Sequence, residues 1–278
     1  MRRLAIGTLA LLSCKMVGDT YRCTADSQCV LGGEAGRCES SGYCSFPDAS
    51  CGSGQRYGQW APAPVGSSCV APPLYFYDGF DGTMSSSWSV DVENGSDIRV
   101  DATKMFRGSG ALAVTVNSGA ASYELVHLVR PLALSPVYAR AYVWIPSTAT
   151  LSLSSDAQLM TYRDNSDDPF PLAALTMSSA FRLGAAVQNW TATPAASVAS
   201  SAIPTDRWVC VEWSVQYRDT PAVSTSQDGS VVASVAPAAL ANPLNSVAIG
   251  FAGPPPLAPF TFWIDELALD KSPIGCDR

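Results

Sequence analysis

Val-Tyr-Ala-Arg-Ala-Tyr-Val-Trp-Ile, residues 137–145, is the stretch that decides the fold. Small or aliphatic side chains alternate in it with large aromatic or charged ones, which is typical of a strand that buries one face. The alternation recurs at residues 208–217, 112–116 and 247–251, and Asp228-Gly229 is a hairpin-turn signal. No helical period is sustained for three turns. The sequence therefore predicts an all-β protein whose main part is a two-sheet antiparallel sandwich.

The charge balance disfavours one class of partner. The chain has 278 residues, with 17 Lys and Arg against 24 Asp and Glu, so its net charge is −7. Removing residues 1–13 would remove Arg2 and Arg3, and the charge would become 15 − 24 = −9. Nucleic-acid binding needs clustered basic residues to contact phosphates, so we expect no nucleic-acid partner.

The N-terminal residues have the layout of an export signal. Arg2-Arg3 precedes an apolar run over residues 4–12, and Cys14 follows the small residue Ser13. The run is too short for a transmembrane helix, which needs about 20 apolar residues. A plain secretory signal is one interpretation, although it leaves the position of the cysteine without a role.

Cys14 and the residues before it also resemble the lipobox of bacterial lipoproteins, in which this cysteine is lipidated and becomes the mature N-terminus. The resemblance implies a signal peptide at 1–13 and a lipid anchor with its tether at 14–22. It further implies an exported protein that lipid anchors to a bacterial membrane, at the outer membrane or the cell surface. Two or more acyl chains together give stable attachment.

Eight of the nine cysteines remain once Cys14 is set aside for lipid. An even number in an exported protein indicates disulfides, and the absence of any Cys-x-x-Cys pair disfavours zinc. Six of the eight lie in residues 23–70, a module with few aliphatic side chains that needs crosslinks to fold. Six cysteines allow fifteen pairings, which the sequence does not distinguish. The pairing that we put forward is Cys23–Cys38, Cys29–Cys44 and Cys51–Cys69.

The last two cysteines, Cys210 and Cys276, are expected to pair with each other, because this leaves an even set in the module. The alternative partner for Cys276 is Cys69, since those two residues bracket the sandwich. A Pro-rich junction separates the module from the sandwich, which we place at residues 71–276.

Three motifs of the module suggest a family. They are Cys-Thr-Ala-Asp-Ser-Gln-Cys at 23–29, Gly-Tyr-Cys-Ser-Phe-Pro-Asp at 42–48 and Cys-Gly-Ser-Gly-Gln-Arg-Tyr at 51–57. They resemble the small cysteine-rich modules that follow the lipid anchor in myxobacterial surface lipoproteins. The resemblance covers about a sixth of the chain and implies no known chemistry. A spacer and a protein-binding module both remain open.

A second set of motifs runs through the sandwich. Tyr-Asp-Gly-Phe-Asp at 77–81 is followed by Trp88, Gly-Ser-Gly-Ala-Leu-Ala-Val at 108–114, Ala-Arg-Ala-Tyr-Val at 139–143 and Trp-Ile-Asp-Glu-Leu at 263–267. In this order they resemble strands of concanavalin A-like jelly rolls, the lectin, laminin-G and glucanase group. The resemblance implies a jelly roll whose first and last strands lie side by side.

The same resemblance implies two kinds of site. One is a structural calcium ion near the terminal strands, with Asp78 and Asp265 as ligands; the alternative is that both are solvated carboxylates. The other is a sheet face that binds polysaccharide, for which Arg140, Tyr142 and Trp144 share one side of a strand. The alternative is that these side chains pack beneath loops or against the other sheet.

Enzyme signatures of this fold are incomplete. The Glu-x-Asp-x-x-Glu pattern of its glucanases is absent, as is Gly-x-Ser-x-Gly. A polysaccharide lyase would use His127, the only histidine, with Tyr123, Arg140 and Tyr142, but the glutamine two residues before the histidine in related alginate lyases is Leu125 here. We therefore expect non-catalytic binding of glycans or of other surface or matrix components. A lyase and a structural or adhesive module are the alternatives.

Overall fold

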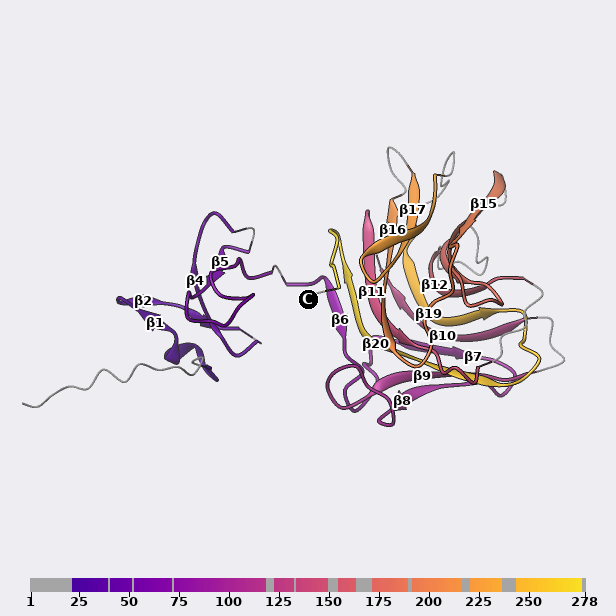
Figure 1. The fold of residues 1–278 in the computed structure, drawn as a ribbon, viewed down its shortest axis with the longest axis horizontal. Coiled ribbons are helices and arrows are strands. Elements are labelled where there is room, and N and C mark those ends of the chain that lie inside the picture. The colour runs from indigo at the N-terminus through magenta and orange to yellow at the C-terminus, as the bar shows by residue number, and fades with distance from the viewer. Residues whose placement is uncertain are drawn as a thin grey trace, which may run out of the picture. The chain divides into compact units, whose positions relative to one another are not determined.

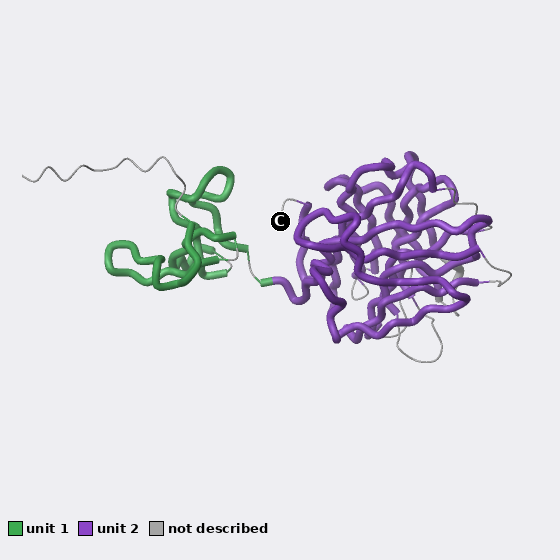
Figure 2. The backbone as a smooth tube through the Cα atoms, turned by 90° about the horizontal axis from the view of Figure 1, so that it is seen from below, with its two compact units in different colours: residues 1–73 green, residues 74–278 purple. Residues whose placement is uncertain are grey.

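A computed structural model describes residues 22–39, 41–51, 53–71, 73–118, 123–132, 134–149, 155–163, 172–189, 192–216, 221–236 and 244–276. The lipidation predicted at Cys14 lies outside these ranges. The chain divides into two compact units, Met1–Pro73 and Leu74–Arg278, which Figure 2 distinguishes by colour. Within the described ranges, no helix is long and apolar enough to cross a membrane.

The first unit has little regular structure. Its elements are the 3₁₀ turn η1 (Asp26–Gln28) and the short strands β1 (Val30–Leu31), β2 (Glu34–Ala35), β3 (Arg37–Cys38), β4 (Cys44–Pro47) and β5 (Gln55–Tyr57). Strands β1 and β2 form a hairpin through Gly32 and Gly33, whose positive φ angles of 59° and 92° suit a tight two-residue turn. Strands β3, β4 and β5 form a separate antiparallel sheet.

Disulfides crosslink the first unit. The structure joins Cys23 to Cys38, Cys29 to Cys44, and Cys51 to Cys69. In the second unit it joins Cys210 to Cys276. These are the four pairs put forward from the sequence, and Cys69 is therefore not the partner of Cys276.

The second unit is built from long strands, shown in Figure 1. They are β6 (Phe76–Asp78), β7 (Ser89–Val92), β8 (Asp97–Asp101), β9 (Ala111–Val116), β10 (Glu124–Pro131), β11 (Val137–Trp144), β12 (Ala157–Arg163), β13 (Leu172–Met177), β14 (Leu183–Asn189), β15 (Ala192–Val198), β16 (Trp208–Gln216), β17 (Ala222–Gln227), β18 (Ser230–Val235), β19 (Ser246–Gly253) and β20 (Phe260–Asp270).

These strands form two large antiparallel sheets. The seven-stranded sheet has the order β15-β14-β13-β12-β19-β10-β7, and the eight-stranded sheet has the order β18-β17-β16-β11-β20-β9-β8, with β6 paired to β20. The first and last strands of the sandwich therefore lie side by side, with Asp78 opposite Leu267. The all-β class and the two antiparallel sheets predicted from the alternation are confirmed.

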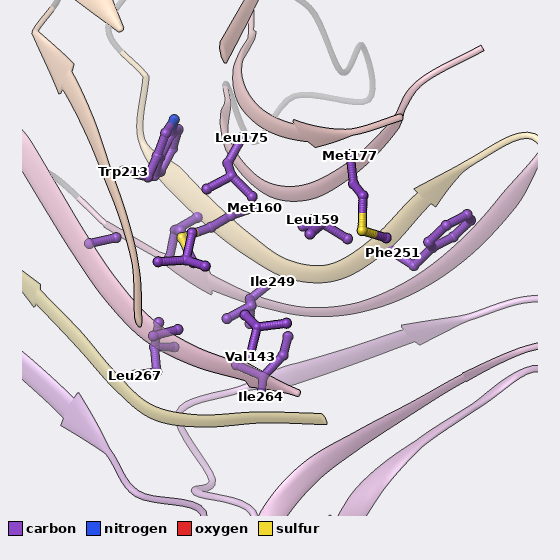
Figure 3. Close-up of a cluster of buried hydrophobic side chains, with 14 of the residues drawn as sticks. Val143, Leu159, Met160, Leu175, Met177, Trp213, Ile249, Phe251, Ile264 and Leu267 are labelled. Atoms are coloured by element: carbon purple, nitrogen blue, oxygen red, sulfur yellow. The ribbon is translucent and has the colours of Figure 1, made fainter. Parts of the chain in front are cut away.

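The hydrophobic core fills the space between the two sheets. Alternate residues of β11, such as Val137 and Val143, point into it, as does Trp213 of β16. Figure 3 shows side chains from both sheets meeting there, among them Val143, Leu159, Met160, Leu175, Ile249, Phe251, Ile264 and Leu267. Each sheet consequently has one face in the core and one outer face.

Candidate functional site

The outer face of the seven-stranded sheet carries the single histidine. Val126 and Leu128 of β10 belong to the core, so His127 between them points to the opposite side of the strand. His127 lies opposite Asp91 of β7 and Gly250 of β19 in the register. Gly250 has a φ of 140°, and a Cβ there would lie only 2.0 Å from the carbonyl oxygen of Val126, so this position next to His127 requires glycine.

A row of small side chains crosses five adjacent strands of this face. The register places Ala248 opposite Thr161, Thr161 opposite Ala174, Ala174 opposite Ala186, and Ala186 opposite Ala196. At about 4.8 Å between strands, the row is about 19 Å long. Ala196 is exposed whereas the other four side chains are buried, so solvent reaches the row at the β15 end.

Arg163 supplies a positive charge to the same face as the histidine. It ends β12, which is separated from β10 only by β19, and alternation from the core residue Tyr162 places Arg163 on the outer face. Burial, with a smaller contribution from the charge of Arg163, lowers the pKa of His127 to about 3. His127 is 2% exposed, and among the described residues its Nδ1 has no hydrogen-bond partner. The imidazole is therefore neutral at pH 7.

Tyr123 brings a phenol to the same group. It lies four residues before His127, directly ahead of β10, and 43% of it is exposed. Burial raises the pKa of its hydroxyl, and the nearby charge of Arg163 partly opposes the rise. The outer face thus assembles a cation, a phenol and a neutral imidazole, to which we refer as the Arg163 group.

The predicted face of Arg140, Tyr142 and Trp144 lies on the other sheet and is not open. The three side chains do share the outer side of β11, but Arg140 and Tyr142 are only 1% and 6% exposed. Residues 103–109, between β8 and β9, cover them: the ring of Phe106 stacks on Tyr142 with 3.7 Å between ring centroids. These side chains therefore pack beneath a loop instead of presenting a ligand-binding surface.

Two further contacts hold residues 103–109 on this sheet. Lys104 places its Nζ 4.4 Å from the ring centroid of Trp144, and the Trp208 Nε1–H donates to the carbonyl oxygen of Met105 at 3.0 Å. The sequence pattern shows which residues share a strand face, but it does not show which loop crosses that face.

Arg140 is bound within this sheet. Its Nη2 donates to the carbonyl oxygen of Glu266 at 3.3 Å and lies 3.9 Å from Glu266 Oε2, while burial lowers the pKa of the guanidinium. The hydroxyl of Tyr77 donates to Glu266 Oε1 at 2.5 Å. His127 and Arg140 belong to different sheets and face away from each other, so the lyase set drawn from the sequence is not assembled. Arg163, which the sequence analysis did not single out, lies beside His127 instead.

The two carboxylates predicted to bind calcium are both occupied. Asp78 Oδ1 accepts from the Phe80 N–H at 2.9 Å, and Asp78 Oδ2 accepts from the Trp88 Nε1–H at 2.8 Å. Asp265 Oδ2 accepts from the Phe106 and Arg107 N–H groups, and Asp265 Oδ1 from the N–H of Glu266. Each of the four carboxylate oxygens therefore already accepts at least one hydrogen bond from the protein, and calcium binding at this pair stays a prediction.

Burial raises the pKa of Asp265 to about 6, although the three N–H donors act in the opposite direction. The side chain is fully buried, and it fixes residues 103–109 to β20. Its role in the structure is thus to position this loop.

Comparison with known proteins gives the fold class. No family model matches the chain, and no curated protein matches it either. Among solved structures it is similar to an endo-β-1,4-glucuronan lyase from the fungus Trichoderma reesei, at 13% identity and a TM-score of 0.58, over 72% of this chain and 96% of that one. It is also similar to the cellulose-induced protein Cip1, at 17% identity and a TM-score of 0.53, over 72% and 99%. The fold is thus a concanavalin A-like jelly roll.

Proposed function

We propose that this protein is an exported, lipid-anchored surface protein whose jelly roll binds acidic polysaccharide without cleaving it. The proposed contact is the Arg163 group on the outer face of the seven-stranded sheet. The observation that carries the proposal is the position of Arg163, which is partly exposed on the same sheet face as His127, with only β19 between their two strands.

The chemistry of these side chains matches a uronate. A guanidinium forms paired hydrogen bonds with a carboxylate, and this geometry favours arginine for carboxylate recognition. The half-exposed ring of Tyr123 offers an apolar surface for a sugar ring and a hydroxyl for hydrogen bonding. The row of small side chains lies on the same face of the sheet and reaches solvent at Ala196.

Binding without catalysis follows from the protonation states. In a β-eliminating lyase, a base takes the proton at C5, the C4–O bond breaks as the C4–C5 double bond forms, and an acid protonates the leaving oxygen. A base for this step works best with a pKa near the working pH. His127 has a pKa of about 3 and is 2% exposed, while Tyr123 has a raised pKa and stays protonated. Neither group suits the role of base at neutral pH.

The test is a binding titration of the oxidised chain with glucuronan and, in parallel, with a neutral β-glucan. We expect binding to glucuronan that weakens with salt, and a loss of about tenfold or more in Arg163→Met, since a charge-assisted hydrogen bond contributes about 1.5–3 kcal/mol. Arg99→Met is the matched control, because Arg99 is exposed on β8 of the other sheet. Equal binding of the neutral glucan, or equal loss in both variants, would contradict the proposal.

A lyase is the second candidate, because His127, Tyr123 and Arg163 include the types of side chain that the elimination uses. The same samples would be followed for the near-ultraviolet absorbance of unsaturated products. Product that disappears in Tyr123→Phe or His127→Ala would replace the binding proposal by the lyase.

The membrane anchor has its own test. Cells that express the full chain would be given a fatty acid with a clickable label, and we expect the label in the wild type and none in Cys14→Ser. Label of equal strength in both would refute lipidation at Cys14 and leave the polysaccharide proposal untouched.

A further inference from the structure

The cysteine-rich unit carries an apolar groove that the jelly roll does not explain. A cavity of about 300 Å³ is lined by Val30 and Leu31 of β1, Tyr43, Phe46 of β4, and Trp60, together with Gln28, Cys29, Cys44, Gly58 and Ala61. Leu31, Phe46 and Trp60 also line a second cavity of about 330 Å³. These three side chains therefore lie between two adjoining cavities and line both of them.

The groove has an unusually exposed apolar rim. Val30, Leu31 and Trp60 are 62%, 43% and 55% exposed, while Tyr43 beneath them is buried. No Asp, Glu, Lys or Arg lines the 300 Å³ cavity. A contiguous exposed apolar surface on so small a unit is unfavourable in water and indicates a surface that meets another phase or partner.

We propose that this rim rests in the interfacial region of the lipid bilayer that holds the anchor. The inference rests on the proposed lipidation of Cys14. Seven residues separate Cys14 from Arg22, where the described structure begins, so at about 3.5 Å per residue the unit begins within about 28 Å of the anchored cysteine. The tether thus restricts the unit to the membrane surface, whatever else it does.

The side chains match a membrane–water interface. Tryptophan is enriched at membrane–water boundaries because its ring is apolar and its N–H is polar. The Val30–Leu31 pair sits on a hairpin that is exposed on both strands, so it can enter the bilayer edge without unfolding the unit. The charged side chains near the rim, Asp48 and Arg56, line the adjoining 330 Å³ cavity, whereas the 300 Å³ cavity has none in its lining.

The experiment uses the only cysteine outside the four disulfides. The oxidised chain from residue 14 onward would be coupled through the Cys14 thiol to a maleimide lipid in phosphatidylcholine vesicles whose acyl chains carry bromine near the carbonyl end. Bromine quenches tryptophan fluorescence only on contact. We expect quenching in the coupled wild type, most of it lost in Trp60→Phe and less of it in Leu31→Ser.

Leu257→Ser is the matched control, because Leu257 is 81% exposed on the jelly roll and should leave quenching unchanged. Absence of quenching, or equal quenching with and without Trp60, would overturn the proposal. A blue shift of Trp60 emission that rises with protein concentration and not with lipid would assign the groove to a second copy and equally overturn it. Because the coupling is chemical, these outcomes do not depend on whether cells lipidate Cys14.

Discussion

The two units of this chain reach a stable fold by opposite means. In the cysteine-rich unit, strands of two to four residues are mostly exposed, and the buried apolar side chains are few besides the cysteines themselves. In the jelly roll, strands of up to eleven residues enclose a core whose members run from Phe80 to Leu269, and one disulfide suffices. Crosslinks thus substitute for buried area where a segment is too small to bury enough apolar surface.

Reduction of the disulfides should produce the largest difference in stability between the two units. The disulfides of the first unit close loops of 15, 15 and 18 residues, each of which contributes about 3 kcal/mol in the chain-entropy model. Their combined loss, about 9 kcal/mol, is as large as the whole stability of a typical domain. With a thiol reductant we expect amide exchange to become fast throughout residues 22–71 while the jelly-roll strands stay protected. Equal protection of both units under reduction would refute the contrast.

Truncation of a core side chain should destabilise the jelly roll alone. Trp213 is 1% exposed among core residues from both sheets, so Trp213→Ala should lower the free energy of unfolding by about 3–5 kcal/mol in urea titrations. Trp213→Phe should cost less, because the Nε1–H of Trp213 has no hydrogen-bond partner among the described residues. Disulfide formation in the first unit, followed by free-thiol counts, should be the same in both variants.

Removing the disulfide of the jelly roll should lower the free energy of unfolding by less than the chain-entropy model gives for its loop. Cys210 and Cys276 are 66 residues apart, which gives about 4 kcal/mol as an upper value. The Gly275 N–H still donates to Glu212, and the Tyr142 hydroxyl still donates to the Cys276 carbonyl, so the C-terminal segment stays attached. Cys210→Ala with Cys276→Ala should remain folded at 25 °C by circular dichroism. Unfolding of this double variant would show that the jelly roll also relies on its crosslink.

One carboxyl group of the jelly roll, that of Asp265, should make the free energy of unfolding depend on pH. Because burial raises the pKa of Asp265 to about 6, the folded state holds a proton there that the unfolded state releases near pH 4. Its contribution to stability is fully present below about pH 4 and is lost as the pH rises through 6. In urea titrations between pH 4 and 7, Asp265→Asn should flatten this part of the profile. An unchanged slope would assign the dependence to other groups.

Calcium is expected to have the smallest effect on the stability of the jelly roll. Since Asp78 and Asp265 direct their oxygens at hydrogen-bond donors, we expect the same melting temperature in calcium and in a chelator. A rise in melting temperature with calcium would show that these donors give way to the ion.

The sequence predicted the burial of a side chain where that burial depends on the residue's own strand, but not where it depends on a loop from elsewhere in the chain. Alternation along residues 137–145 follows from one strand facing one core, so it predicted the burial of Val137 and Val143 correctly. The covering of Tyr142 depends on Phe106, which arrives from a loop elsewhere in the chain and carries no periodic signal.

The Arg163 group was missed for a related reason. Arg163 comes near His127 only because β19 enters the sheet between β10 and β12, although β19 follows both in the sequence by more than eighty residues. The pairing of strands distant in sequence decides such a site. An arginine at the end of one strand does not by itself indicate which distant strand it will lie near.

Strand β6 has a mechanical consequence. If the chain is held by its N-terminal end while the jelly roll grips a polymer, tension enters the jelly roll at Phe76–Asp78, which pair with only three residues of β20. One side-chain hydrogen bond crosses this short seam, from Tyr77 to Glu266, and another, from Trp88 to Asp78, ties β6 to the segment before β7. Under pulling, the seam would open before the core does, so the polymer grip would outlast the first rupture.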